Sequence, residues 1–374
     1  MDKFGFLLHN TDWHMTAKAY DEPRLDFSIE ENSDRQRMTE RVLRWVYPYY
    51  QSTITGIKSK TGKEIEGYFF VSMMVPEQFL NMNDSVLLRH LVKVGELAQS
   101  MGVGMLGLGA YTALVGRRGL ELAKRMDIPI TTGSAYTIVS IIEAIFLAAS
   151  QVRLDLKKSN CVIVGATGKI GKVCSKMLVM SGQVGKVTLV ARNESRLDAQ
   201  KDDLLSIGNS CEVKVSTNLR EALKHADVAL FVTNYPKSLV SEDDFPPGAI
   251  VCDVSVPKNV SEDIFEGRND ILLFEGGVIR PPSNVDFNFF FGPNKGLAYA
   301  CIAETMILTL ERKFENYSIG ANVDFDKVIE MKELAEKHGF CINELRSAYE
   351  VITDQRISRT AKSISDKNKK LVYL

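Results

Sequence analysis

The chain has 374 residues, of which 45% are hydrophobic and 25% charged, with 46 Lys and Arg against 47 Asp and Glu. A globular domain has roughly 100–200 residues, so this length predicts two domains with sizeable cores. The composition excludes collagen-like, low-complexity and mostly disordered chains. The net charge of −1 argues against nucleic acid as a partner.

The apolar stretches and the cysteines predict a cytoplasmic protein without a metal site. Met1–Leu8 lacks the small-residue cleavage site of a signal peptide. Val103–Gly116 and Ile138–Ala149 are shorter than the roughly 18–20 residues that a membrane span needs. The six Cys residues lack paired metal-ligand spacing, so we expect free thiols.

The first part of the chain predicts a mixed α/β domain. A capping Ser and a helical period predict a helix over residues 33–45, and residues 1–32 show no clear period from which an element could be predicted. Ile54–Ile57 and Ile65–Val71 flank a Gly-containing turn and predict a hairpin. Pro76–Ser100 and Ser134–Val152 predict helices, the second of them mostly apolar and capped by Ser134.

From Cys161 onward, short Val- and Ile-rich runs alternate with helical segments. The predicted strands are Cys161–Val164, Lys186–Ala191, Glu212–Val215, Asp227–Thr233, Ala249–Val254 and Ile271–Phe274. This alternation is typical of βαβ units in a doubly wound parallel sheet.

The alternation of strands and helices ends at Pro282. After it we predict two further helices, over Asn294–Glu315 and Asp326–His338. We interpret Ser358–Lys370, which is polar and Lys-rich, as a frayed tail. The chain therefore predicts a substrate domain over residues 1–152, a Rossmann-type domain over 153–285, and C-terminal helices over 286–374.

A glycine-rich loop follows the first of these strands and opens a helix over Lys172–Met180. It reads Gly165-Ala166-Thr167-Gly168-Lys169-Ile170-Gly171. Its three glycines allow a tight turn, close approach of a pyrophosphate, and close packing of helix on sheet. The helix N-terminus adds amide donors, so we predict a dinucleotide site here rather than a ligand-free turn.

The end of the second strand predicts NADPH as the cofactor. An NAD site usually has an acidic residue there, whereas this chain has Arg192 followed by Asn193, with Arg196 one turn on. Arg suits a 2′-phosphate, and we expect Glu194 to face solvent. Further cofactor contacts are expected where later strands end, at Thr233, Asn234, Gly276 and Gly277.

Cys301 is the candidate nucleophile, because it lies near the start of a helix that follows the nucleotide domain. A helix N-terminus lowers the pKa of a thiol, and the thiolate is the reactive species. The alternative is a small buried hydrophobic side chain on an apolar helix.

The chain resembles the long-chain fatty acyl-[acyl-carrier-protein] reductases of cyanobacteria and their bacterial homologues. The resemblance runs from about Trp45 to about Cys341. The motifs that carry it are Thr55-Gly56-Ile57, Thr61 to Gly67, Pro76-Glu77, Leu106 to Thr112, Thr131 to Ser134, Val164 to Gly168, Ala191-Arg192-Asn193, Tyr299 to Glu304 and Lys337 to Phe340.

This resemblance implies NADPH-dependent reduction of a fatty acyl thioester to an aldehyde through an acyl group on Cys301. It implies a fold similar to shikimate dehydrogenase or glutamyl-tRNA reductase, with the C-terminal helices returning to the cleft. An acyl carrier protein is the expected partner, although coenzyme A stays open as the donor. Contact with a membrane surface and the oligomeric state also stay open.

Several side chains are candidates for supporting roles. We expect the loop Thr131–Ser134 to line the nicotinamide pocket, with Thr132 and Ser134 as candidate catalytic residues. The alternative is that this loop only caps the following helix. Glu304, one turn after Cys301, is a candidate proton relay or a structural carboxylate. The aromatic stretch Phe287–Phe291 predicts an acyl tunnel or apolar core. Arg37, Arg41 and Arg44 predict a docking face for an acidic carrier or a solvated surface.

Two alternative functions remain at this stage. A shikimate- or quinate-type dehydrogenase would use a Lys/Asp pair in the first domain and would not need Cys301. A non-catalytic NADPH sensor would bind the nucleotide without turnover. A glutamyl-tRNA reductase is disfavoured, because its nucleophile belongs in the first domain and this chain has no Cys before Cys161.

Overall fold

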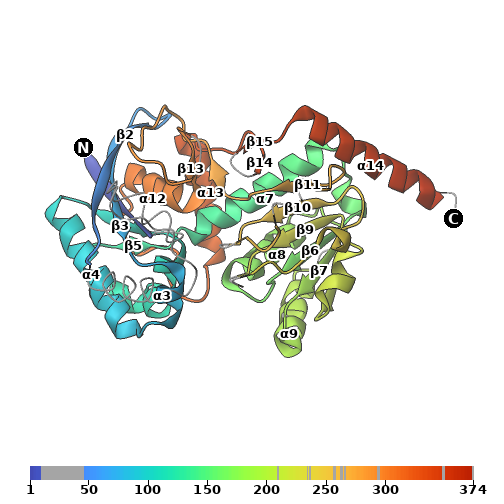
Figure 1. Ribbon diagram of the computed structural model, residues 1–374, viewed down its shortest axis with the longest axis horizontal. Coiled ribbons are helices and arrows are strands. Elements are labelled where there is room, and N and C mark those ends of the chain that lie inside the picture. Colours follow the sequence, from blue (N-terminus) through green and yellow to red (C-terminus); the bar gives the residue numbers. More distant parts are fainter. Residues whose placement is uncertain are drawn as a thin grey trace, which may run out of the picture. The chain divides into compact units, whose positions relative to one another are not determined.

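The computed structural model describes residues 1–9, 46–208, 210–233, 235, 237–255, 258–261, 264, 267–292, 295–347 and 350–372. They form two compact units (Figure 1). Unit 1 takes in Met1–Tyr136 and Ile279–Cys341, and unit 2 takes in Thr137–Val278 and Ile342–Leu374. Each unit therefore joins two separate stretches of chain, unlike the three contiguous ranges expected. The helix expected over residues 33–45 lies outside the described residues, and so does its basic face.

Unit 1 contains a five-stranded sheet in the order β2-β3-β1-β4-β5. Its strands are β1 (Asp2–His9), β2 (Tyr49–Lys58), β3 (Glu64–Ser72), β4 (Met105–Leu108) and β5 (Ile130–Thr131). The predicted hairpin is confirmed, since β2 and β3 pair antiparallel, while the other neighbours pair in parallel. The central strand β1 was not predicted, because a strand buried on both faces shows no polar alternation.

Helices cover both faces of this sheet. The predicted helix over Pro76–Ser100 is divided into α3 (Pro76–Asn81) and α4 (Asp84–Ser100), because Asn83 caps α4 by accepting from Ser85. α4 packs on the face that carries Leu106 and Leu108. The short elements η1 (Ala110–Leu114), α5 (Val115–Arg118) and α6 (Leu120–Ala123) follow β4.

The opposite face of the unit 1 sheet is covered by α12 (Ala300–Glu311), against which α13 (Phe325–His338) packs. α12 begins later than the predicted Asn294, because Ala298–Tyr299 forms the short strand β13. Gly107 of β4 lies under this helix, where a side chain would meet Thr305 and Phe6. Other short strands are β12 (Val278–Ile279), β14 (Arg346–Ser347) and β15 (Glu350–Val351).

Unit 2 contains a fully parallel six-stranded sheet in the order β11-β10-β9-β6-β7-β8. All six predicted strands are confirmed. They are β6 (Asn160–Val164), β7 (Lys186–Val190), β8 (Glu212–Ser216), β9 (Val228–Phe231), β10 (Ile250–Asp253) and β11 (Leu272–Phe274). The order reverses between β6 and β9, as in the doubly wound Rossmann sheet.

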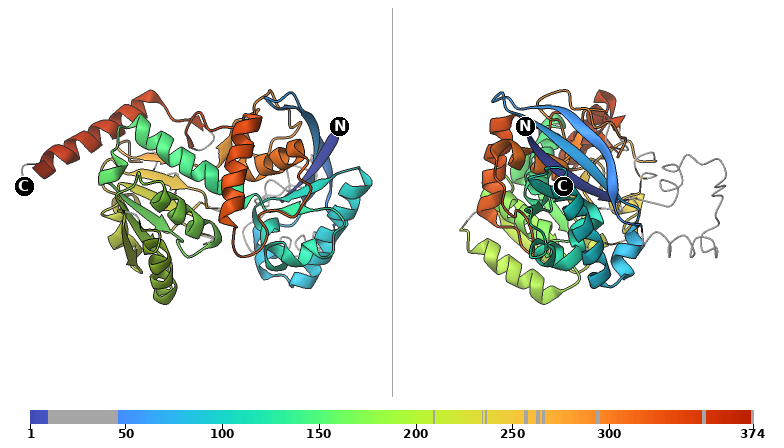
Figure 2. Two further views of the ribbon diagram at one scale, coloured as in Figure 1. Left: turned by 180° about the vertical axis from the view of Figure 1, so that it is seen from behind. Right: turned by 90° about the vertical axis from the view of Figure 1, so that its left-hand side faces the viewer.

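Helices lie on both faces of the unit 2 sheet (Figure 2). α8 (Lys169–Met180) and α9 (Glu194–Leu205) pack side by side, and Gln200 of α9 donates to Ser175 of α8 at 2.7 Å. The short helix α10 (Leu219–Leu223) packs on the face of Val162 and Val164. The 3₁₀ turns η2 (Leu156–Lys158) and η3 (Glu242–Asp244) complete the unit.

The long apolar helix predicted from Ser134 is α7 (Ser134–Gln151). By length and composition it is, within the described part of the chain, the one helix that could cross a membrane. However, 67% of its apolar window is buried inside the protein, as in the core helix of a globular domain.

The interpretation of Ser358–Lys370 as a frayed tail is wrong. These residues belong to α14 (Asp354–Val372), which runs beside β11 (Figures 1 and 2). Thr360 and Ile364 are buried, and Lys367 forms an ion pair with Asp227 at 2.7 Å. A polar helix with one buried stripe resembles a tail in composition, because only its spacing reveals the apolar face.

Candidate active site and dinucleotide site

Tyr299 is the N-cap residue of α12, Ala300 is the first residue of the helix, and Cys301 is the second. Cys301 keeps intermediate exposure, while Cys161, Cys174, Cys211 and Cys252 are buried and Cys341 is exposed. It is therefore a partly exposed cysteine at a helix N-terminus.

The loop after β5 lies directly against this helix start. Gly133 has a φ of +71°, a conformation that side chains other than glycine rarely adopt. A Cβ at this position would overlap the Cα and Cβ of Cys301 and lie 3.1 Å from its carbonyl carbon. The Thr-Thr-Gly-Ser motif thus brings its backbone into contact with Cys301.

Glu304 holds this loop on the helix. It is fully buried, one turn beyond Cys301. The hydroxyl of Thr131 donates to its Oε1, and the backbone N–H of Tyr136 donates to its Oε2 at 2.8 Å. Of the two expectations for Glu304, these contacts favour a structural carboxylate, although a buried one rather than a solvated one.

Thr132 and Ser134 bond to each other and to a segment that the sequence did not suggest. Their hydroxyls lie 2.9 Å apart, and the Thr132 hydroxyl donates to the Ser318 carbonyl at 2.5 Å. The Ser318 hydroxyl accepts from the Ala135 N–H at 3.1 Å. Ser318 has a φ of +54° in the loop between α12 and α13. No local sequence signal marks a serine whose role depends on such a conformation.

The electrostatic setting of Cys301 differs from the expectation of a lowered pKa. Burial raises the pKa of the Cys301 thiol to about 12, and the negative charge of Glu304 adds to this effect. The backbone N–H groups of Ile302 and Cys301 act in the expected direction and lower the pKa, but they do not outweigh burial. At neutral pH the thiol is therefore protonated.

The aromatic stretch after β12 packs into unit 1. Phe287 is buried and stacks on Phe69 of β3 with ring centroids 5.8 Å apart. The ring centroid of Phe291 lies 4.9 Å from that of Phe69 and 6.0 Å from that of Tyr299, the N-cap residue of α12. Phe290 points outward and is 65% exposed. The stretch thus supplies apolar packing next to the start of α12.

The dinucleotide loop in unit 2 has the geometry that its glycines predict. Gly165 has a φ of +86°, and a Cβ there would lie 2.8 Å from the Val232 carbonyl oxygen. Gly168 is the N-cap of α8, and a Cβ on Gly171 would lie 2.9 Å from the Cα of Ala166. α8 begins at Lys169, three residues earlier than predicted. The loop therefore presents a helix N-terminus beside β6, where the strand order reverses.

The remaining loop residues have different environments. Ala166 and Lys169 are buried, while Thr167 and Ile170 keep intermediate exposure. A bare backbone cradle at a helix N-terminus fits a pyrophosphate.

The end of β7 is open to solvent and cationic. Arg192, Glu194 and Arg196 are exposed. Asn193 caps α9, since its side-chain oxygen accepts from the Arg196 N–H at 2.9 Å. The two guanidinium groups and the lack of an acidic residue at the strand end fit the 2′-phosphate of NADPH.

The later strand ends are fixed by a buried carboxylate. Asp253, at the end of β10, accepts from the backbone N–H groups of Asn259 and Val260, each at 2.8 Å. Asn259 in turn accepts from the Thr233 hydroxyl. Thr233 is thus positioned by Asn259, which the sequence did not single out, and Asn234 lies outside the described residues.

The Gly276–Gly277 pair lies in the turn after β11. A Cβ on Gly276 would lie 2.8 Å from Cys252 and Val254 of the neighbouring strand, and Gly277 has a φ of +94°. Close packing and turn geometry account for both glycines.

The structure brings the expected residues together as two groups, each in its own unit. Cys301, Glu304, Thr132 and Ser134 cluster in unit 1, and the dinucleotide loop, Arg192, Arg196 and Thr233 lie at the carboxyl edge of the unit 2 sheet. Within the described ranges, no group of three or more His, Cys, Asp or Glu side chains could hold a metal ion.

Comparison with known proteins places the nucleotide unit in a broad class. The shikimate / quinate 5-dehydrogenase family model matches residues 147–274, which corresponds to the sheet of unit 2. The structure of shikimate 5-dehydrogenase from Listeria monocytogenes, with shikimate and NAD bound, covers 89% of this chain and 96% of its own at 10% identity, with a TM-score of 0.37.

Two curated relatives match beyond that unit. The aminotransferase PigE of a Serratia species is 28% identical over 366 residues, which is 95% of this chain but 41% of the relative. The long-chain acyl-[acyl-carrier-protein] reductase of Synechococcus elongatus is 27% identical over 299 residues, which is 76% of this chain and 84% of the relative. This chain therefore spans less than half of the Serratia relative.

The strand order, the glycine cradle and the family match agree with one another. The α/β class and the Rossmann-type sheet expected from the sequence are confirmed, and the cofactor is a nicotinamide dinucleotide whose 2′-phosphate form, NADPH, fits the cationic end of β7. The chain therefore carries a Rossmann-type NAD(P)-binding domain.

Proposed function

We propose that this protein reduces a long-chain fatty acyl thioester to the aldehyde with NADPH, through an acyl group carried on Cys301. The observation that carries this proposal is the contact between the Thr131–Ser134 loop and Cys301, made through Gly133 and secured by Glu304. A loop fixed by hydrogen bonds against a partly exposed cysteine at a helix N-terminus is an arrangement that suits acyl transfer.

The first step is transfer of the acyl group to Cys301. A bond forms between its sulfur and the acyl carbon, the bond from that carbon to the carrier sulfur breaks, and the carrier leaves as a thiol with the proton that Cys301 loses. This step fixes the acyl carbon on a rigid helix, which replaces a bimolecular encounter by an intramolecular one.

The second step is reduction of the bound acyl group. NADPH supplies a hydride to the acyl carbon when it is bound. The resulting oxyanion on the sulfur-bound carbon needs nearby donors, for which the backbone N–H groups at the start of α12 are suited. Breakage of the carbon–sulfur bond then releases the aldehyde, and the Cys301 sulfur regains a proton.

Glu304 acts in this scheme as a positioning residue. Both of its carboxylate oxygens accept hydrogen bonds from the loop, so it fixes the loop against Cys301. Its negative charge adds to the effect of burial, which is the main cause of the raised pKa of the Cys301 thiol.

The relative from Synechococcus elongatus supports this substrate class, because its similarity includes the substrate unit as well as the nucleotide unit. The match to the shikimate / quinate family supports the alternative dehydrogenase only for the nucleotide half of the chain. The acyl carrier protein is the proposed donor, with coenzyme A as the second possibility to assay.

Replacement of Cys301 by Ser separates the alternatives. We expect C301S to bind NADPH as the wild type does and to lose reduction of palmitoyl thioesters of both carriers. A shikimate-type dehydrogenase would instead keep its activity in C301S. A sensor would show no turnover of any thioester in the wild type, and either of these results would overturn the proposal.

A further inference from the structure

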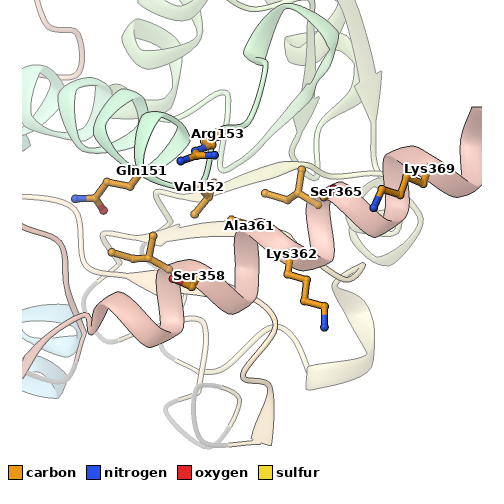
Figure 3. Close-up of a pocket in the computed structure, with 10 residues that line it drawn as sticks. Gln151, Val152, Arg153, Ser358, Ala361, Lys362, Ser365 and Lys369 are labelled. Atoms are coloured by element: carbon orange, nitrogen blue, oxygen red, sulfur yellow. The ribbon is translucent and has the colours of Figure 1, made fainter.

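A cavity lies in unit 2, away from the dinucleotide loop, between the end of α7 and α14 (Figure 3). Its volume is about 760 Å³, within the size range of small-molecule sites. Figure 3 shows Gln151, Val152 and Arg153 at the end of α7 beside the row of side chains on α14. The residues that line it are Gln151, Val152, Arg153, Ile357, Ser358, Ala361, Lys362, Ile364, Ser365 and Lys369.

The charged side chains in this lining are all cations. Arg153, Lys362 and Lys369 line the cavity together with no acidic residue. Across the described ranges, none of the three has a carboxylate within ion-pair distance. The two acidic residues of α14, Asp354 and Asp366, are exposed and do not line the cavity.

Nearby acidic groups are already paired elsewhere. Asp227 forms an ion pair with Lys367 at 2.7 Å, and Asp155 lies 3.9 Å from Lys158. Among the residues that the structure describes, the three lining cations, which are exposed, therefore have no counterion, and this concentration of positive charge favours an anionic ligand that carries more than one negative charge.

Four of the ten lining residues are aliphatic. Val152 and Ile364 are buried, and Ile357 and Ala361 keep intermediate exposure. A bare phosphate would leave most of the 760 Å³ empty and these aliphatic side chains in contact with water. The ligand that fits must carry an apolar part beside its charged group.

The wall formed by α14 is fixed in place rather than loosely attached. Gly248 has a φ of +79°, and a Cβ there would lie 3.0 Å from the backbone nitrogen of Ile364. The Lys367–Asp227 ion pair holds the next turn of the helix. In addition, the side-chain oxygen of Gln151 is buried without a hydrogen-bond partner among the described residues, which leaves an acceptor for a ligand donor.

We propose that this cavity binds a phosphate-bearing amphiphile. The phosphate lies among Arg153, Lys362 and Lys369, and the apolar part lies against Val152 and Ile364. This site is independent of the proposed reduction at Cys301, so the two proposals stand or fall separately.

The test measures binding to the full chain by calorimetry with soluble dihexanoyl phosphatidic acid. Dihexanoylglycerol, which has the same tails without phosphate, and inorganic phosphate are the comparison ligands. We expect phosphatidic acid to bind about tenfold or more tightly than either comparison ligand. Equal binding by inorganic phosphate would overturn the amphiphile, and equal binding by dihexanoylglycerol would overturn the phosphate site.

The double variant Arg153→Gln, Lys362→Gln tests the location. We expect it to weaken binding about tenfold or more. The matched control is Lys224→Gln, Lys332→Gln, which makes the same change in net charge at exposed sites outside the cavity. Gly248→Ala keeps every charge but displaces α14, and we expect it to weaken binding as well. Unchanged binding in the Arg153/Lys362 double variant would overturn the site.

Vesicles identify the natural source of the phosphate group. Co-sedimentation with vesicles that contain phosphatidic acid, lost in the Arg153/Lys362 double variant, supports a lipid headgroup. Binding of the monomeric ligand without vesicle binding supports a soluble phosphorylated molecule. A lack of binding to either form by the wild type would overturn the proposal.

Discussion

At the scale of single residues, the site is organised by contacts of Cys301 rather than by an intrinsically acidic thiol. Burial and Glu304 keep its pKa near 12, so the thiol is protonated at rest and loses its proton as it bonds to the acyl carbon. The loop that touches it is fixed by two hydrogen bonds to one buried carboxylate. Changes in this carboxylate or in the loop should therefore affect reactivity in opposite ways.

Glu304→Gln should make Cys301 more reactive. The substitution removes a negative charge that raises the pKa of the thiol, while the amide can still accept from the Tyr136 N–H and contact Thr131. A fall of one unit in the pKa gives about tenfold more thiolate at neutral pH. The measurement is the rate of alkylation by iodoacetamide at pH 8, read at Cys301 by peptide mass.

Glu333→Gln is the control, since it makes the same charge change at an exposed position on α13. An alkylation rate in Glu304→Gln no higher than in this control would show that Glu304 does not set the pKa of Cys301.

Gly133→Ala should abolish most of the reductase activity. The new methyl group strains a backbone with a φ of +71° and collides with Cys301, which displaces the reacting sulfur. A displacement of about 1 Å costs on the order of a hundredfold in rate. The measurement is kcat with palmitoyl thioester, together with the melting temperature.

Gly62→Ala is the matched control for backbone strain. Gly62 has a φ of +85° in the β2–β3 turn, with nothing within 4 Å of an added Cβ. It should lose about 1 kcal/mol of stability and keep its activity. Wild-type activity in Gly133→Ala would contradict the proposed contact at Cys301.

The residues of the site could be predicted only as far as they form local motifs. Cys301 and the glycines of the dinucleotide loop follow from helix position and spacing. Ser318 and Asn259 could not be predicted, because each supports the site through contacts with residues distant in the sequence. The raised pKa of Cys301 was missed for the same reason, since burial depends on tertiary packing.

At the scale of elements, a buried hydrogen-bonded chain ties the β2–β3 hairpin of unit 1 to its C-terminal helices. The Ser59 hydroxyl lies 2.8 Å from His338 Nδ1, and His338 Nε2 lies 2.9 Å from Glu311. His338 is fully buried, and burial lowers its pKa more than Glu311 raises it. Gly339 follows it in the left-handed conformation that ends α13.

The folding stability of the protein should fall as the pH drops from 7 to 5. Because the pKa of His338 is lowered in the folded state, the unfolded state binds more protons below about pH 6.5. His338→Gln should lose about 1–3 kcal/mol at pH 7 and show a weaker pH dependence. The measurement is the free energy of unfolding by urea at several pH values.

The flattening in His338→Gln should be partial. Burial also lowers the pKa of His90 to about 4, and His90 adds to the same slope. An unchanged slope in His338→Gln would show that His338 does not titrate with unfolding.

The cationic end of β7 should set the preference for NADPH. Arg192→Ala removes an exposed guanidinium that fits the 2′-phosphate, so the KM for NADPH should rise by about 10- to 100-fold. The KM for NADH should change little, because NADH lacks this phosphate. Equal losses with both cofactors would place Arg192 elsewhere in the site.

Elements with a strong local pattern could be predicted, and those that depend on context could not. The six strands of unit 2 were correctly predicted from apolar runs between helical segments. The strand β1 and the helix α14 were missed, the first because it is buried on both faces and the second because its buried stripe is narrow. Two expected helix starts shifted, at Ala300 and Lys169, where a short strand or a Gly N-cap decides the boundary.

At the scale of the whole molecule, the chain divides between two units so that each unit joins two separate stretches of the sequence. Unit 1 is completed by Ile279–Cys341, which supplies Cys301, and unit 2 is completed by Ile342–Leu374, which supplies α14. The α/β class and the Rossmann sheet could be predicted from the sequence, because apolar runs alternate there with helical segments. The division of the C-terminal helices between the units could not be predicted, since that depends on long-range packing.

The central claim is that Cys301 carries the acyl group, and intact-mass spectrometry tests it most directly. The protein is incubated with palmitoyl thioester without NADPH, and the modified peptide is then mapped. We expect one palmitoyl adduct, located on Cys301, which disappears with release of aldehyde when NADPH is added. A protein that binds NADPH but stays unmodified, across several acyl lengths and with both carriers, would contradict it.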